Sequence, residues 1–164
     1  TVPPLYVLGA SLTLQSVKGK RQVPIEEFFT GVKKTIIRPE EILTTISFPV
    51  LAANSKSFFK KLGQRKALAI SKVSVAATID IQAGMIKGVR IALGGVAPTV
   101  IHASQTQAYL RGKTLKKPTI AQAAKIIRQE SKAISDIRST AEYRNEMTGL
   151  LLARGLEEIA EGII

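Results

Sequence analysis

The densest group of side chains able to do chemistry is a basic segment near the middle of the chain. Six cationic or amide side chains fall between positions 60 and 72: Lys60, Lys61, Gln64, Arg65, Lys66 and Lys72. Ammonium and guanidinium groups at this density can bind phosphates, either those of a nucleic acid or those of a nucleotide cofactor. A solvated basic face has the same composition, because surface lysines need no ligand. Composition alone therefore leaves both interpretations open.

Few side chains of this sequence could serve as catalytic nucleophiles or metal ligands. The chain has no cysteine and one histidine, His102. This excludes thiolate nucleophiles, disulfides, iron–sulfur ligation and cysteine- or histidine-based metal sites from this chain. A Ser-His-Asp triad would have to use His102, which falls between an expected strand and an expected helix, where a capping or surface role is favoured. We expect no catalytic residue and no metal ligand here.

Two further motifs favour a structural interpretation. Gly94-Gly95 follows a strand pattern, but no GxGxxG or GxxxxGK[ST] pattern surrounds it. Close backbone packing at a strand end is therefore favoured over phosphate binding. Segment 134–144 is dense in polar groups, and its Asp136 can pair with Arg138 or Arg144. A capping network at a helix entry accounts for most of this segment.

The charge balance fits an anionic partner and a solvated basic surface about equally well. Lysine and arginine number 24 against 12 aspartate and glutamate residues, so the net charge is +12. Such a surface suits a nucleic acid, a nucleotide cofactor, an acidic protein or a membrane surface. No segment approaches the roughly 20 apolar residues of a membrane span, and no signal peptide opens the chain. We expect a cytoplasmic protein, and the start at Thr1 indicates a processed or cut chain.

A small sheet and several helices must position these groups. Alternating apolar residues predict a strand over 73–82, a tight turn at Ala83-Gly84 and a second strand over 89–93. A third strand begins at Phe58. We expect three helices to cover the apolar face of this sheet, over 104–111, 119–131 and 139 to the C-terminus. The second and third start at capping boxes, Thr119/Gln122 and Ser139/Glu142. We expect an α+β fold, in which a three-stranded antiparallel sheet packs on a helical bundle.

The residues before this sheet are expected to be rich in strands. Alternation predicts strands over 6–15, 21–25 and 42–48, with one helical turn over 25–29. So few strands do not close a core alone. We interpret residues 1–53 as the tail of a larger domain or as an extension of the sheet domain, with a linker over 52–57.

Taken together, ordered segments of the chain resemble a known family. TVPPLYVLGASLTL, VPIEEFFTG, RPEEILTTISFP, FFKKLGQRKALAISKV, RIALGGVAPT and ISDIRSTAEYR stand in the order found in the FAD-binding subunit of the xanthine dehydrogenase and carbon monoxide dehydrogenase family. The resemblance covers almost the entire chain, and the ordered set is specific.

The resemblance implies a flavoprotein component of a molybdenum hydroxylase. In such enzymes iron–sulfur clusters carry electrons from the molybdenum centre to FAD, which passes them to an acceptor. FAD would be the cofactor of this subunit, and the molybdenum cofactor and 2Fe-2S clusters would sit on partner chains. The partners would be an iron–sulfur subunit and a molybdenum-binding subunit, in a heterotrimer or its dimer.

The family also implies a domain division and site residues. Residues 1–53 would be the C-terminal remnant of an FAD-binding domain whose Gly-rich pyrophosphate loops are missing here, and residues 57–164 the flavoprotein C-terminal domain. Leu43 matches a position that packs on FAD, and Lys60 matches a lysine near it. The loop Lys61–Lys72, with Lys61, Gln64 and Arg65, resembles a segment that covers the flavin. We expect this chain alone to be inactive.

Two other functions fit the residues less well. A basic nucleic-acid-binding module needs only the charge and the hairpin, and salt-sensitive binding would reveal it. It is disfavoured because only Phe58 and Phe59 accompany the basic segment as aromatic residues. A protein–protein interaction domain without a ligand is the third interpretation.

Overall fold

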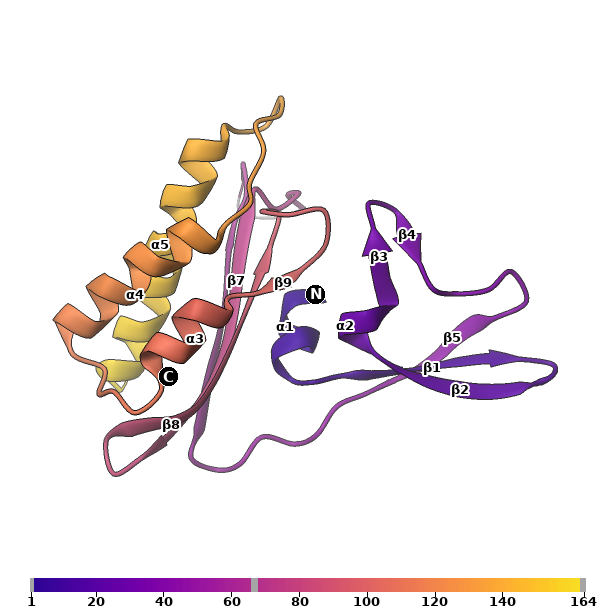
Figure 1. The fold of residues 1–164 in the computed structure, drawn as a ribbon, viewed down its shortest axis with the longest axis horizontal. Helices are drawn as coiled ribbons and strands as arrows, with labels where there is room; N and C mark the ends of the chain where they lie inside the picture. The colour runs from indigo at the N-terminus through magenta and orange to yellow at the C-terminus, as the bar shows by residue number, and fades with distance from the viewer. Residues whose placement is uncertain (1, 66–67, 163–164) are drawn as a thin grey trace.

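A four-stranded antiparallel sheet has helices on both of its faces (Figure 1). Its order is β6-β7-β8-β9, with β6 at Ser55–Leu62, β7 at Val73–Gln82, β8 at Met85–Gly94 and β9 at Ile101–His102. The computed structural model describes residues 2–65 and 68–162. The expected α+β fold and antiparallel sheet are confirmed. The sheet has one strand more than expected, because the two-residue β9 is too short to show any alternation.

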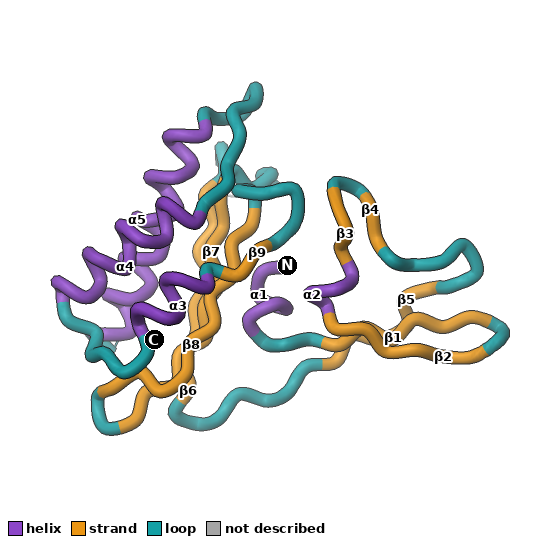
Figure 2. The backbone as a smooth tube through the Cα atoms, viewed as in Figure 1, coloured by secondary structure: helices purple, strands orange, loops and turns teal. Residues whose placement is uncertain are grey.

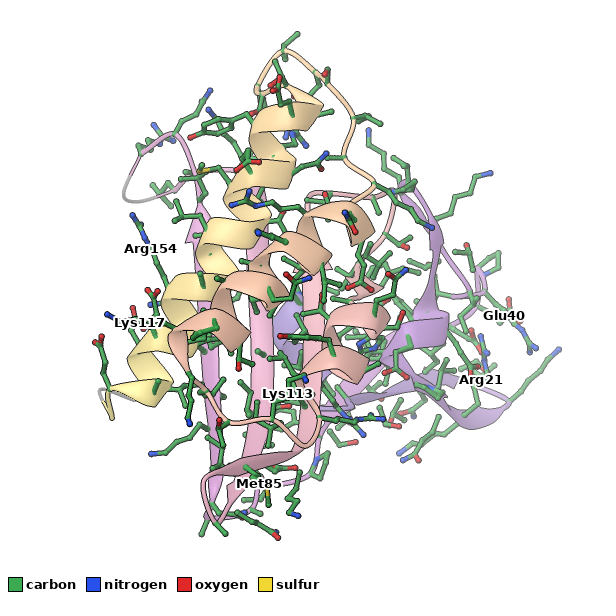
Figure 3. The ribbon with its side chains drawn as sticks, turned by 60° about the vertical axis from the view of Figure 1, so that its left-hand side comes forward. Arg21, Glu40, Met85, Lys113, Lys117 and Arg154 are labelled. Carbon is green, nitrogen blue, oxygen red and sulfur yellow. The ribbon has the colours of Figure 1, made fainter. Side chains whose placement is uncertain are left out.

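One face of this sheet packs on three helices, α3 (Ser104–Leu110), α4 (Lys117–Glu130) and α5 (Ala141–Ala160). Alternate residues of β7 and β8 enter this core with the apolar stripes of the helices. The core residues from the two central strands are Val73, Val75, Ala77, Ile79, Ile86, Val89, Ile91 and Leu93. Cationic side chains such as Lys117 and Arg154 project outward from the helix layer (Figure 3).

The other face of the sheet packs on the N-terminal unit. This unit contains α1 (Val2–Val7), β1 (Ser11–Ser16), β2 (Gly19–Pro24), α2 (Ile25–Phe28), β3 (Phe29–Gly31), β4 (Lys34–Thr35) and β5 (Ile42–Ser47). Its main sheet has the order β2-β1-β5. Tyr6 and Val7 of α1 share a core with Ala76 and Ala92 of the larger sheet. A long loop joins β5 to β6 (Figure 2).

Helix α1 corrects the predicted strand over 6–15, of which β1 is the second half. Pro3 and Pro4 are tolerated because the first turn of a helix does not use its N–H groups. A helix buries both Tyr6 and Val7, which a strand would place on opposite faces. Gly9, at φ +65°, ends the helix, and Ala10 N donates to Leu5 O at 3.0 Å in a Schellman arrangement.

Both predicted helix starts are displaced. α4 begins at Lys117, with Lys116 at its N-cap, so the Thr119/Gln122 capping box is not used. Pro118 in the first turn supplies the start signal instead. α5 is capped by Thr140, whose Oγ1 accepts from Tyr143 N at 3.2 Å, in place of the neighbouring Ser139. Over 2–65 and 68–162, none of the helices combines the length and apolarity needed to cross a bilayer.

Candidate functional site

The Gly94-Gly95 pair is closely packed where a Cβ would stand. A Cβ at Gly94 would lie 2.6 Å from Ser74 Oγ and 2.8 Å from Pro3 Cγ. Gly95 has φ +80°, and a Cβ there would lie 2.8 Å from the carbonyl oxygen of Lys72. The expectation of close backbone packing is confirmed. Close packing therefore accounts for both glycines without a phosphate ligand.

Arg144 fixes this strand end to the helix layer. Its Nη1 donates to Gly95 O at 2.9 Å, and its Nη2 pairs with Asp136 at 2.6 Å. The N–H of Arg138 and the guanidinium of Arg144 both donate to Asp136, which holds the pKa of this carboxyl below its usual range. Of the two arginines proposed to pair with Asp136, Arg144 forms the ion pair. The structure gives this polar segment a structural role.

Lys60 faces the helices. It shares this face of β6 with Phe58 and Leu62, which pack in the core under α5. Its Nζ donates to both carboxylate oxygens of Glu158 at 2.5 Å. The ammonium group that the resemblance places near FAD is therefore already paired with a carboxylate.

Lys61 lies on the opposite face of β6, together with Phe59. Its Nζ donates to the carbonyl oxygen of Ala69 at 3.2 Å. The Phe59 side chain is 43 % exposed. α1 covers this face over β7 and β8, so an aromatic ring and an ammonium group remain accessible beside α1. A planar ring system with electron-rich oxygens fits such a pair of groups.

Leu43 lies on β5, every residue of which is exposed. It is paired across the strands with Leu14, which is buried in the core of the N-terminal unit. Ile42, Ile46 and Phe48 are also exposed along this edge. Leu43 and Lys60 thus belong to different sheets, and Lys60 faces away toward α5.

Gln64 and Arg65 come together around a hollow of about 330 Å³. Ile70, Lys72 and Arg138 also line it. Arg65 Nη2 donates to Leu68 O at 2.9 Å, which holds this part of the loop. The loop thus meets the segment before α5, a contact that sequence spacing gave no means of finding. Lys66, the remaining residue of the basic segment, lies outside the described residues.

Sequence reasoning also missed a cleft between the β3–β4 hairpin and the loop after β8. Its volume is about 500 Å³, and it is lined by Val2, Phe29, Lys33, Lys34, Gly95 and residues 97–100, among others. These positions come from three segments far apart in the chain, so no local pattern marks them. Over the described residues, no group of three His, Asp or Glu side chains is placed to hold a metal ion.

Two family profiles match the chain in succession. The profile described as "FAD binding domain in molybdopterin dehydrogenase" matches residues 1–51. The profile described as "CO dehydrogenase flavoprotein C-terminal domain" matches residues 57–159. Among curated relatives, the carbon monoxide dehydrogenase medium chain of Afipia carboxidovorans is 31 % identical over 93 % of this chain and 53 % of its own length. The xanthine dehydrogenase/oxidase of Gallus gallus is 33 % identical over 78 % of this chain and 10 % of its own length.

Solved structures agree with these matches. A crystal structure of the Cu,Mo-CO dehydrogenase in its cyanide-inactivated form superposes with a TM-score of 0.88 at 29 % identity, over 98 % of this chain and 56 % of that chain. Quinoline 2-oxidoreductase from Pseudomonas putida 86 gives 0.87 at 27 % identity, over 96 % of this chain and 54 % of that chain. The chain spans about half the length of the medium chains and subunits that it matches. It belongs to the family of flavoprotein subunits of the carbon monoxide dehydrogenase and xanthine dehydrogenase type.

Proposed function

We propose that this chain is the C-terminal portion of the FAD-binding subunit of a molybdenum hydroxylase. Its role would be to help hold FAD between the iron–sulfur clusters of a partner chain and an electron acceptor. The observation that carries this proposal is the succession of the two family profiles, in order, over residues 1–51 and 57–159. The superposition over 98 % of the chain supports the same conclusion.

The residues of this chain fit one part of FAD. The open face of β6, with Phe59 and Lys61, can contact the isoalloxazine ring, and the exposed edge at Leu43 can pack on the cofactor. Close packing accounts for the glycines of the Gly94-Gly95 turn, so they give no sign of a pyrophosphate site. FAD supplies the redox chemistry when it is bound, and protein groups position and tune it. These residues would orient the ring and shield it from water, and they would bind FAD weakly without a pyrophosphate-binding segment.

The resemblance assigned the lysine near FAD to Lys60, and the geometry favours its neighbour. Lys60 forms an ion pair with Glu158 on the face of β6 that the helices cover, whereas Lys61 lies on the opposite face with Phe59. In the full-length subunit, we expect Lys61→Met to lower the flavin retained per subunit at least three-fold. Lys60→Met is the matched control and should leave flavin retention unchanged. If Lys60→Met lowers flavin retention and Lys61→Met does not, Lys60 is the lysine near FAD.

The remaining parts of the proposal concern organisation. We divide the chain into residues 1–53, belonging to an FAD-binding domain, and residues 57–164, forming the flavoprotein C-terminal domain. The partners would be an iron–sulfur subunit and a molybdenum-binding subunit, in a heterotrimer or its dimer, located in the cytoplasm. The term "medium chain" used for the relatives is consistent with such an assembly.

The visible absorption spectrum of the native, full-length gene product tests this function. The protein should be purified gently, with any chains that accompany it. Flavin bands together with iron–sulfur absorbance from associated chains are expected. A colourless preparation without partner chains would overturn the proposal.

A further inference from the structure

Helix α1 lies on the outer face of the larger sheet, which is the face opposite α3, α4 and α5. Residues paired across the strands form three rows on this face, and each row runs from β6 through β7 to β8. The rows are Lys61-Ser74-Gly94, Phe59-Ala76-Ala92 and Ser57-Thr78-Arg90. α1 contacts β7 and β8, so it lies over the second and third members of these rows and beside the β6 members.

Small residues in the middle row let α1 approach the sheet closely. Ala76 and Ala92 are 0 % exposed, and they share a core with Tyr6 and Val7 of the helix. In the next row, Thr78 Oγ1 donates to the carbonyl oxygen of Val7 at 3.4 Å. Protein interiors are close-packed, so a larger side chain at either alanine would have to displace the helix or distort its neighbours.

Pro3 holds the first turn of α1 against the end of β8. A Cβ at Gly94 would lie 2.6 Å from Ser74 Oγ and 2.8 Å from Pro3 Cγ. The serine hydroxyl can rotate away from such a Cβ, but the proline ring is rigid and moves only with its helix. Even one methyl group at position 94 would therefore shift α1 on the sheet.

The two sides of this contact belong to different parts of the proposed flavin site. α1 falls in the segment that matches the FAD-binding profile, whereas β7 and β8 fall in the segment that matches the flavoprotein C-terminal profile. β6, which carries Phe59 and Lys61, is paired with β7 along its full length and therefore moves with the sheet. The contact of α1 with β7 and β8 thus fixes the distance between the FAD-binding segment and the β6 face.

We propose that Ala92 and Gly94 are positioning residues for the flavin. Both lie under α1 and act through it, because their small size sets how close the FAD-binding segment lies to Phe59 and Lys61. This proposal rests on the proposed function, which places the flavin ring against those two side chains. A ligand held by two linked sites binds tightly only when the spacing of the sites matches the ligand.

Two matched valine substitutions in the full-length subunit test the proposal. Ala92→Val adds two methyl groups under α1, whereas Ala77→Val adds them on the other face of the sheet, where Ala77 is equally buried in the core with the helices. Both variants should melt below the parent, because both overpack a core. Only Ala92→Val should raise the Kd of FAD, by about ten-fold, and change the visible circular dichroism of the bound flavin.

Rescue across the contact provides a second measurement. Gly94→Ala should also weaken FAD binding. Adding Pro3→Ala removes the ring carbon that the new Cβ would meet, so the double variant should recover the FAD affinity and the flavin dichroism of the parent. Should Ala92→Val not fold, Ala92→Gly and Ala77→Gly replace the valine pair, and again only the change at position 92 should weaken FAD binding.

Several outcomes would overturn the positioning role. Unchanged FAD affinity and dichroism in Ala92→Val would do so, as would equal weakening by Ala92→Val and Ala77→Val, because reduced stability alone would then explain the loss. A defect of Gly94→Ala that Pro3→Ala does not relieve would also count against it. In each case the parent still binds FAD, and the proposed function stands. A parent subunit that binds no FAD would overturn the proposed function itself, so the two failures are distinguishable.

Discussion

Arg144 on α5 donates a hydrogen bond of 2.9 Å to the carbonyl oxygen of Gly95, 49 residues earlier in the sequence. The guanidinium also pairs with Asp136 at 2.6 Å, and the Arg144 side chain is only 7 % exposed. One side chain therefore joins the end of β8, the α4–α5 loop and the first turn of α5.

Replacing Arg144 should destabilise the whole sheet–helix unit. Arg144→Met leaves the Gly95 carbonyl and the Asp136 carboxylate without their partner, and we expect a loss of about 2–4 kcal/mol in unfolding free energy. Urea denaturation followed by circular dichroism measures this loss. Arg154→Ala, at an exposed position of the same helix (Figure 3), should change stability by less than about 0.5 kcal/mol. Equal effects of the two substitutions would show that the buried network contributes little.

Helix α3 takes its N-terminal cap from a distant helix. Ala103 at its N-cap offers no side-chain acceptor, and Glu130 at the end of α4 accepts from Gln105 N at 2.7 Å and Thr106 N at 2.9 Å. Glu130→Ala should cost about 1–2 kcal/mol, the usual range for loss of a cap. Amide hydrogen exchange at Gln105 and Thr106 should accelerate in the variant. The exposed neighbour Gln129→Ala should leave both amides protected, and unchanged exchange in Glu130→Ala would contradict this capping role.

The acid stability of the N-terminal unit should depend on Glu41. Arg21 Nε donates to its carboxylate at 2.6 Å, and this bond, with others, lowers the pKa of Glu41 to about 2. Because the folded pKa is depressed, the stabilisation is complete above the unfolded pKa of roughly 4.3 and is lost as pH falls toward 2. Melting temperatures at pH 7, 4 and 2.5 measure this loss of stabilisation.

A neutral substitution isolates this contribution. Glu41→Gln should melt lower than the parent at pH 7, and the two should converge as the pH approaches 2.5. Glu40→Gln, at the adjacent exposed position, should follow the parent at every pH. A parent–variant difference that stays constant from pH 7 to pH 2.5 would exclude the Arg21–Glu41 pair as its source.

Strong local patterns made the larger sheet and its helices predictable. The alternation of β7 and the turn at Ala83-Gly84 agree with the structure, because both faces of that strand and the positive φ of the turn are local properties. α1 was mistaken for a strand because its apolar residues continue the alternation of β1. Its helical form depends on contact with Ala76 and Ala92, far along the chain.

The candidate site was less predictable than the fold. A two-residue period shows that Lys60 and Lys61 point to opposite faces, but it does not say which face the helices will cover. That choice depends on Phe58 and Leu62 packing under α5, about 95 residues later. The contact of Arg138 with the β6–β7 loop has the same origin. Tertiary packing decides both which face of β6 the helices cover and which loop Arg138 contacts. Residue spacing within one segment does not indicate either.

A close contact between α5 and β6 yields the last prediction. Gly155 of α5 faces the ring of Phe58 on β6, and a Cβ at position 155 would lie 2.5 Å from two of the ring carbons. In a free helix, alanine would be favoured over glycine by about 1 kcal/mol. Here Phe58 is buried and the ring has little room to move, so overpacking should dominate and Gly155→Ala should destabilise the chain by about 1–3 kcal/mol.

A double-mutant cycle with Phe58→Leu, measured by urea denaturation, separates the overpacking from the helix preference. In the Phe58→Leu background, where the side chain is smaller, the alanine should cost much less or become stabilising, because the clash is relieved while the helix preference remains. If Gly155→Ala costs the same in both backgrounds, the contact with Phe58 is not the reason for glycine at this position.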